Sequence, residues 1–224
     1  MSGAEGESHS FDVSAILFDI DGTLVDSTAA VERAWRATAH RYRIDVDELM
    51  RVCHGRRAED TITRFVALER RAEALAFHDH LELHDLDGVV ALPGAAALLS
   101  RVPSARWAAV TSGSRALMTA RLRAAGLPVP AVLVTADDVR EGKPAPEGYL
   151  AAASTLGVDP TRCLVIEDAP AGIAAGQRSG ARTLAVATSH DGADLTGATT
   201  VVADLRAIGV EVRDDCLRIT IGPR

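Results

Sequence analysis

The stretch VSAILFDIDGT at residues 13–23 places two aspartates directly behind an apolar run. Val13–Phe18 is short and rich in strand-forming residues, which predicts a buried strand. Asp19 and Asp21 follow it, and Gly22 favours a tight turn in which backbone N–H groups face a common site. The strand is therefore expected to deliver acidic side chains at its carboxyl end.

The rest of the chain repeats this design. Further apolar runs predict strands at Trp107–Val110, Val132–Val134, Cys163–Ile166, Thr183–Val186 and, more weakly, Thr200–Val202. Helical patterns lie between them, at Gly94–Arg101, Ser114–Ala125, Pro146–Leu156 and Pro170–Gly180. This alternation predicts an α/β fold with a mainly parallel sheet and helices on both faces. Residues 210–221 are expected to form a terminal hairpin.

Residues 27–90 break the alternation, because they are charged and helical in period, at Ala29–Tyr42, Val46–Cys53 and Arg57–Phe77. We expect a helical cap at 27–90 inserted into a core domain made of 13–26 and 91–224. Open α/β sheets bind ligands at the carboxyl ends of their strands, so the cap would roof that site. Residues 1–12 begin small, polar and acidic, and are expected to form a flexible tail.

Composition excludes several classes of protein. The net charge of −7 over 224 residues argues against a nucleic-acid binder, which needs an excess of Lys and Arg. No apolar run approaches the roughly 20 residues of a membrane helix. Cys53, Cys163 and Cys216 form no paired motif and are expected to be reduced. We therefore expect a cytoplasmic protein, and nothing in the sequence demands more than a monomer.

Asp19 and Asp21, two carboxylates with one residue between them, can perform different tasks. Asp19 could attack phosphorus or coordinate a metal, and Asp21 could move the proton of a leaving oxygen. The alternative, two solvated loop acids, fits poorly behind an apolar strand, because buried like charges are costly without a cation.

Polar groups also follow three later segments. Thr111, Ser112 and Gly113 precede a helix, which suits an anion site or a simple N-cap. Lys143 is the only lysine among 24 basic residues. Either this position requires a compact ammonium in place of a guanidinium, or a single lysine remains by chance in an arginine-rich chain. Glu167 and Asp168 end a strand and could be Mg²⁺ ligands or an ordinary helix cap.

These four segments, in this order, resemble the haloacid dehalogenase superfamily of phosphohydrolases. The resemblance implies that Asp19 is the nucleophile and Asp21 the acid/base, with Thr111 and Lys143 orienting the phosphoryl group. It implies a Mg²⁺ cofactor held by Asp19, the Asp21 carbonyl and Asp168, with Glu167 in support. Phosphate contacts are also expected at Thr23, Ser112 and Gly113.

Within that superfamily the chain is most similar to the glycerol-3-phosphatase, 2-deoxyglucose-6-phosphatase and hexitol phosphatase group. This implies an enzyme that hydrolyses a small phosphorylated polyol or sugar. A phosphomutase is the first alternative, although Ala58 stands where β-phosphoglucomutases carry a phosphate-gripping Arg; Arg56 or Arg57 could substitute. A non-catalytic phosphate-binding module is the second alternative. Such a module is expected to have lost one or more of four residues, all of which are present here: Asp19, Asp21, Lys143 and Asp168.

Several residues of the 27–90 segment have two interpretations. His54 either packs inside the cap or faces the substrate, and Arg57 is expected to face the substrate rather than solvent. His78, His80 and His84 suggest a metal cluster, but a solvated helix face is favoured because their spacing is imperfect and no cysteine accompanies them. Trp35 is expected to pack inside the cap.

Overall fold

A computed structural model describes residues 9–53 and 55–222 of the chain. Its central sheet has six strands in the order β6-β5-β2-β7-β8-β9, and every neighbouring pair is parallel. The strands are β2 (Ala15–Phe18), β5 (Trp107–Val110), β6 (Leu133–Val134), β7 (Cys163–Glu167), β8 (Arg182–Val186) and β9 (Thr200–Val202). The predicted α/β fold with a parallel sheet is confirmed.

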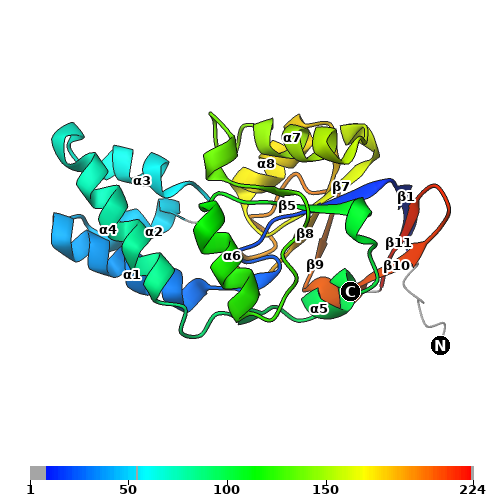
Figure 1. The fold of residues 1–224 in the computed structure, drawn as a ribbon, viewed down its shortest axis with the longest axis horizontal. Helices are drawn as coiled ribbons and strands as arrows, with labels where there is room; N and C mark the ends of the chain where they lie inside the picture. The colour runs from blue at the N-terminus through cyan, green and yellow to red at the C-terminus, as the bar shows by residue number, and fades with distance from the viewer. Residues whose placement is uncertain (1–8, 54, 223–224) are drawn as a thin grey trace.

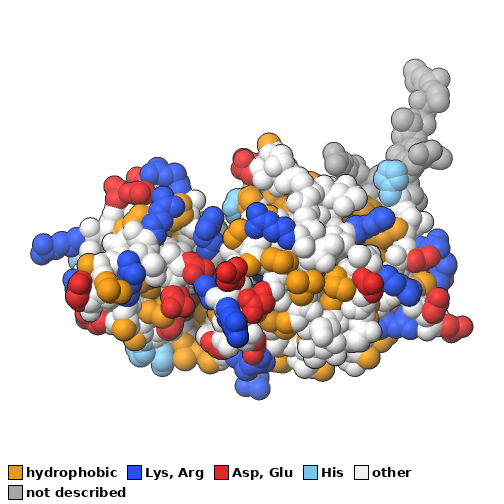
Figure 2. Space-filling view, turned by 90° about the horizontal axis from the view of Figure 1, so that it is seen from above, with side chains coloured by type: hydrophobic (Ala, Val, Ile, Leu, Met, Phe, Trp, Pro, Cys, Tyr) orange, Lys and Arg blue, Asp and Glu red, His pale blue; other side chains and the backbone are white. Residues whose placement is uncertain are grey.

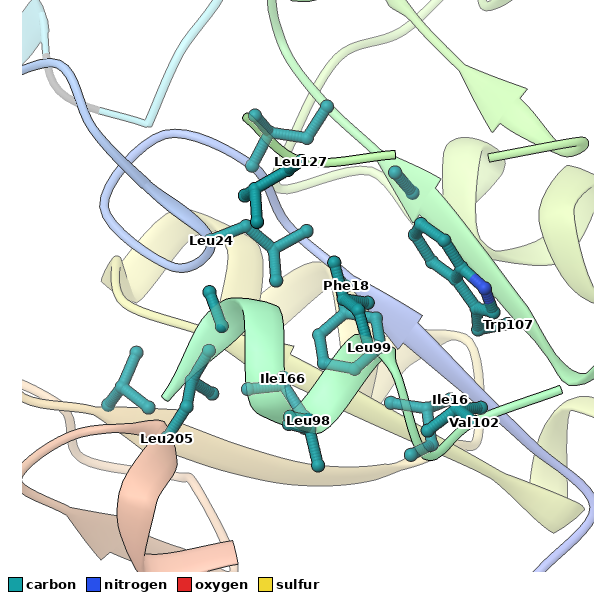
Figure 3. Close-up of a cluster of buried hydrophobic side chains, with 14 of the residues drawn as sticks. Ile16, Phe18, Leu24, Leu98, Leu99, Val102, Trp107, Leu127, Ile166 and Leu205 are labelled. Atoms are coloured by element: carbon teal, nitrogen blue, oxygen red, sulfur yellow. The ribbon is translucent and has the colours of Figure 1, made fainter. Parts of the chain in front are cut away.

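The central strands β2, β5 and β7 are buried along their whole length, and their successive side chains point to opposite faces of the sheet. Ile16 and Phe18 belong to the larger buried cluster, together with Trp107 and residues of α5 (Ala95–Leu99) and α6 (Arg115–Ala124). Figure 3 shows Phe18 among Leu98, Leu99 and Trp107 in this cluster. Ala15 and Leu17 point the other way, against α7 (Glu147–Leu156) and α8 (Pro170–Arg178). Helices therefore cover both faces (Figure 1).

Four helices between β2 and β5 form a body at one end of the molecule, on the left in Figure 1. They are α1 (Thr28–Tyr42), α2 (Val46–Cys53), α3 (Ala58–Phe65) and α4 (Arg71–His84). Trp35, Leu49, Ile62 and Ala74 pack in a hydrophobic cluster of their own, so the prediction that Trp35 is buried among these helices is confirmed. We call α1–α4 the helical insertion.

The structure corrects three details of this segment. The predicted helix at 57–77 is divided at Val66, where the backbone turns extended, and a short 3₁₀ turn at Leu68–Arg70 precedes α4. Two short strands that periodicity cannot reveal, β3 (Val25–Asp26) and β4 (Val90–Ala91), pair antiparallel where the chain enters and leaves the insertion. His78 is fully buried, so the predicted solvated face is wrong for that residue.

A second sheet lies at the opposite end of the molecule, in the order β1-β11-β10. The predicted terminal hairpin is confirmed as β10 (Ile208–Val212) and β11 (Leu217–Ile221). Its third strand, β1 (His9–Val13), pairs antiparallel with β11. The prediction of a flexible tail is therefore wrong for residues 9–12, because the edge of β11 offers backbone hydrogen bonds to an otherwise polar segment.

No helix in the described ranges combines the length and apolarity needed to cross a membrane. Acidic and basic side chains intermingle on the face shown in Figure 2, which presents no broad surface of a single charge. The three cysteines are buried and unpaired.

Candidate active site

The parallel arrangement brings the predicted site residues to one edge of the sheet, because the carboxyl ends of parallel strands lie together. β2 lies between β5 and β7, so Asp19, Thr111 and Glu167-Asp168 emerge side by side. The backbone N–H of Asp19 donates to Ile166 at 3.0 Å and that of Thr111 donates to Val134 at 2.9 Å, which extends the strand pairing up to the site.

Asp19, Glu167 and Asp168 form a buried acidic cluster. Each offers a carboxylate oxygen, and these oxygens lie within 4.8 Å of one another. Burial and the neighbouring acids raise the pKa of Asp19 well above its ordinary range, and burial and Glu167 raise the pKa of Asp168 to about 7. Three carboxylates in so small a space favour a cation. Their hard oxygen donors suit a divalent ion such as Mg²⁺.

Lys143 is the one cation of the described side chains that lies inside this cluster. Its ammonium contacts Asp19 Oδ1, lies 2.6 Å from Oε1 of Glu167, and donates to the carbonyl of Val110 at 3.2 Å. Burial opposes its charge, but the carboxylates of Asp19 and Glu167 outweigh burial and raise its pKa. Lys143 therefore stays an ammonium beside Asp19.

Glu167 is held on both oxygens. Tyr149 donates its hydroxyl to Oε1 at 2.8 Å, and the backbone N–H groups of Asp168 and Ala169 donate to Oε2 at 3.0 and 3.2 Å. With Lys143 also on Oε1, this carboxylate has partners in several directions. Its geometry suits fixing the ammonium better than offering a free oxygen to an ion.

Asp168 is oriented by two hydroxyl groups. Thr23 donates to Oδ1 at 3.3 Å, and Ser189 donates to Oδ2. Gly22, at φ +83°, lets the backbone approach so closely that a Cβ there would stand 2.1 Å from Oδ2 of Asp168. The turn after Asp21 therefore requires glycine both for its left-handed backbone and for the space that Asp168 fills.

Asp21 projects beside the acidic cluster rather than into it. Ser27 donates its hydroxyl to Oδ1 at 2.7 Å, and Arg121 donates from Nη1 to Oδ2 at 2.7 Å. Asp21 thus has a fixed carboxylate plane next to Asp19 on the same turn.

A cavity of about 230 Å³ lies between this edge of the sheet and the helical insertion. Its floor is lined by residues at the edge of the sheet, namely Asp19, Asp21, Thr111, Ser112, Gly113 and Asp168. Its other side is lined by residues of the 27–90 segment, namely Trp35, Cys53, Arg56, Arg57, His78 and Glu82. The two sides touch where Ser112 donates its hydroxyl to the carbonyl of Gly55 at 3.1 Å. Lys143 lies in an adjoining small pocket that shares Thr111 and Ser112.

The structure therefore brings together the core residues expected from the sequence. The residues expected to contact the substrate from the cap have other partners or lie outside the described residues. Arg57 lines the cavity, but Asp60 accepts two hydrogen bonds from it at 2.8 and 2.9 Å and the carbonyl of Arg140 accepts a third at 3.1 Å. Thr23 is fully buried with its hydroxyl on Asp168. His54 lies outside the described residues.

Four residues that sequence reasoning missed hold the site together, namely Ser27, Arg121, Tyr149 and Ser189. Ser189 follows β8 at the same edge of the sheet. A hydroxyl residue shortly after a predicted strand is a pattern from which Ser189 could have been predicted as a site residue. Arg121 lies 100 residues along the chain from Asp21, and Tyr149 lies on the helix that precedes the strand of Glu167, where no local pattern distinguishes either residue.

Comparison with known proteins identifies the family. Residues 13–180 match the description "haloacid dehalogenase-like hydrolase", and the chain belongs to that family. It is similar to hexitol phosphatase A of Escherichia coli (strain K12), at 43% identity over 87% of this chain and 92% of that one. It is also similar to 2-deoxyglucose-6-phosphate phosphatase 1 of Saccharomyces cerevisiae, at 35% identity over 89% and 91%.

A solved structure supports the same assignment. A hydrolase from Pseudomonas syringae superposes with a TM-score of 0.77 at 29% identity, covering 86% of this chain and 94% of that one. The expected resemblance to this hydrolase superfamily is therefore confirmed.

Proposed function

We propose that this protein hydrolyses the phosphate ester of a small polyol or sugar by transferring the phosphoryl group to Asp19. The observation that carries the proposal is the acidic cluster at the carboxyl edge of the sheet, with Lys143 inside it and the cavity above it. The printed activities of the bacterial and yeast relatives support the substrate class.

The proposal divides the chain into a core, 13–26 and 91–224, and a cap, 27–90. The separate hydrophobic cluster of α1–α4 and the β3–β4 pair at its base support this division. In the proposed enzyme the cap closes over the leaving group and excludes water. Exclusion of water strengthens the electrostatic interactions in the site.

Asp19, Asp168 and the carbonyl oxygen of Asp21 would hold Mg²⁺, which when bound supplies positive charge against the phosphoryl oxygens. Asp19 attacks phosphorus, while Lys143 keeps its ammonium against that carboxylate and the incoming negative charge. Thr111 and Ser112 offer hydroxyl groups, and α6 begins directly behind them, so its N-terminus also favours the anion.

Asp21 moves protons in both halves of the reaction. It gives a proton to the departing alkoxide while the bond from phosphorus to that oxygen breaks. It then takes a proton from the water that hydrolyses the aspartyl phosphate. Because the transition state of phosphoryl transfer is loose, positioning and charge account for most of the acceleration.

The test is a phosphate-release screen with Mg²⁺ over hexitol phosphates, 2-deoxyglucose 6-phosphate and glycerol phosphate, with and without EDTA. We expect release that EDTA abolishes and excess Mg²⁺ restores. Phosphorus NMR of the same samples separates hydrolysis from a mutase, which would move the phosphate without releasing it. Isomerisation alone, or no release from any ester, would refute the proposal.

We also propose a cytoplasmic location, which the three unpaired thiols support because such thiols persist in reducing compartments.

A further inference from the structure

Arg121 is the largest fully buried side chain of the described residues, and its position is unusual for a charged group. It lies on α6, which stands between the helical insertion and the sheet (Figure 1). Its side chain is 2% exposed. A buried guanidinium is costly unless carboxylates and hydrogen bonds compensate it, so this burial needs an explanation.

The guanidinium bridges the two parts of the molecule. Nη1 donates to Oδ2 of Asp21 at 2.7 Å, and Nη2 donates to Oε1 of Glu82 on α4 at 2.8 Å. Among the ion pairs of the described residues, Arg121–Glu82 alone joins residues 27–90 to the rest of the chain. One planar group therefore contacts the proposed acid/base and the insertion at once.

On the insertion side of this bridge, Glu82 lies against a buried histidine. Oε2 of Glu82 lies 3.3 Å from Nε2 of the buried His78. The His78 ring stacks on Trp35 at 3.7 Å between centroids, and its Nδ1 lies 3.1 Å from the hydroxyl of Thr38. Glu82 is thus anchored to the hydrophobic cluster of the insertion.

The Asp21 side is held from two directions. Ser27, at the start of α1, binds Oδ1 at 2.7 Å, and Arg121 binds Oδ2. Two donors on different oxygens fix the plane of a carboxylate in a way that one donor does not. A guanidinium suits this task because its donors are set in a rigid fork, whereas an ammonium is a single point.

We propose that Arg121 is a positioning residue that, braced by Glu82, holds the Asp21 carboxyl group where it protonates the leaving oxygen. The proposal rests on the proposed phosphatase function. In the step concerned, the bond from Asp19 to phosphorus forms and the bond from phosphorus to the leaving oxygen breaks. The Asp21 proton then ends on that oxygen.

This role predicts a dependence on the leaving group. A sugar alkoxide is a poor leaving group and needs the proton, whereas p-nitrophenolate is a stable anion that leaves without one. The Arg121→Met variant is therefore expected to lower kcat/KM for 2-deoxyglucose 6-phosphate about tenfold or more relative to p-nitrophenyl phosphate, as partial loss of general acid catalysis. A merely structural role would lower kcat/KM for both esters alike.

The control is Arg123→Met, which changes the same residue type at an exposed position of the same helix and should leave the ratio of the two kcat/KM values unchanged. In an Asp21→Asn background, Arg121→Met should lower the ratio no further, because the group that it positions is already lost. Glu82→Gln should lower the ratio in the same direction by a smaller factor.

Equal losses on both esters, or a full further drop in the Asp21→Asn background, would overturn the proposal. If Arg121→Met does not fold, as judged by circular dichroism, Arg121→Lys decides. It keeps the charge but cannot span both carboxylates, so the ratio should still fall, and an unchanged ratio would refute the role. A wild-type enzyme inactive on every ester would instead remove the proposed function.

Discussion

The ammonium of Lys143 lies 2.6 Å from Oε1 of Glu167, and that carboxylate is in turn held by backbone N–H groups at the start of α8. The position of the ammonium beside Asp19 therefore depends on a carboxylate whose two oxygens both have partners. Changes around Glu167 should consequently affect both stability and turnover.

Gly172→Ala tests this dependence. A Cβ at position 172 would stand 1.7 Å from Oε1 of Glu167, so the carboxylate must shift and Lys143 with it. We expect a loss of about 1–3 kcal/mol in the free energy of unfolding, typical of overpacking, together with a lower kcat. Urea unfolding and phosphate release measure the two effects. Gly192→Ala, where a Cβ would meet only Cγ1 of Val201 at an ordinary contact distance of 3.8 Å, should leave both near wild type. An active, fully stable Gly172→Ala variant would contradict the argument.

Asp19→Asn should abolish turnover and leave the fold intact, because the amide keeps the shape of the side chain but is no nucleophile toward phosphorus. Phosphate release and circular dichroism check the two halves of this prediction. The matched control is Asp214→Asn, at an exposed position between β10 and β11, which should keep full activity. Undiminished turnover in Asp19→Asn would exclude Asp19 as the nucleophile.

Thr23→Val should weaken metal binding rather than phosphate binding. The change removes the hydroxyl that donates to Oδ1 of Asp168 and preserves the shape of a fully buried side chain. Loss of such a supporting contact to a metal ligand is expected to raise the Mg²⁺ concentration for half-maximal activity about 10- to 100-fold. A titration with Mg²⁺ at saturating substrate measures it. Thr155→Val, on the exposed side of α7, should leave the titration unchanged, and a rise in KM alone would favour the substrate contact expected from sequence.

The ion pair of Glu82 should make stability depend on pH. Burial acts to raise the pKa of Glu82, but His78 and the Arg121 guanidinium outweigh it, so the folded pKa lies below the ordinary value of 4.5. A lowered folded pKa means that the stabilisation is complete above the unfolded pKa and is lost as the pH falls through the folded pKa.

The free energy of unfolding of Glu82→Gln should accordingly lie below that of wild type at neutral pH, and the difference should shrink as the pH falls below about 4.5. Urea unfolding at a series of pH values measures this. Glu211→Gln, at an exposed surface pair, should show no comparable trend. A difference that stays constant with pH would show that Glu82 carries no such stabilisation.

Much of this protein follows from local sequence. The alternation of apolar strands with helices predicts the parallel sheet. The carboxyl ends of parallel strands share one edge, so the chain order also predicts where Asp19, Thr111 and Glu167-Asp168 meet. The helical character of the insertion is likewise visible in its period, although the division of the 57–77 segment and the β3–β4 pair are not.

Only the tertiary structure decided which side chains hold those groups in place. The sequence does not distinguish Arg121 from the other arginines of its helix, and it predicts that His78 belongs to an exposed helix face. Both residues are in fact buried where α6 meets α4. Residues 9–12 read as a polar tail until β11 offers them an edge. The physical reason is common to all three, because burial and hydrogen bonding between segments far apart in the chain depend on packing that no local pattern records.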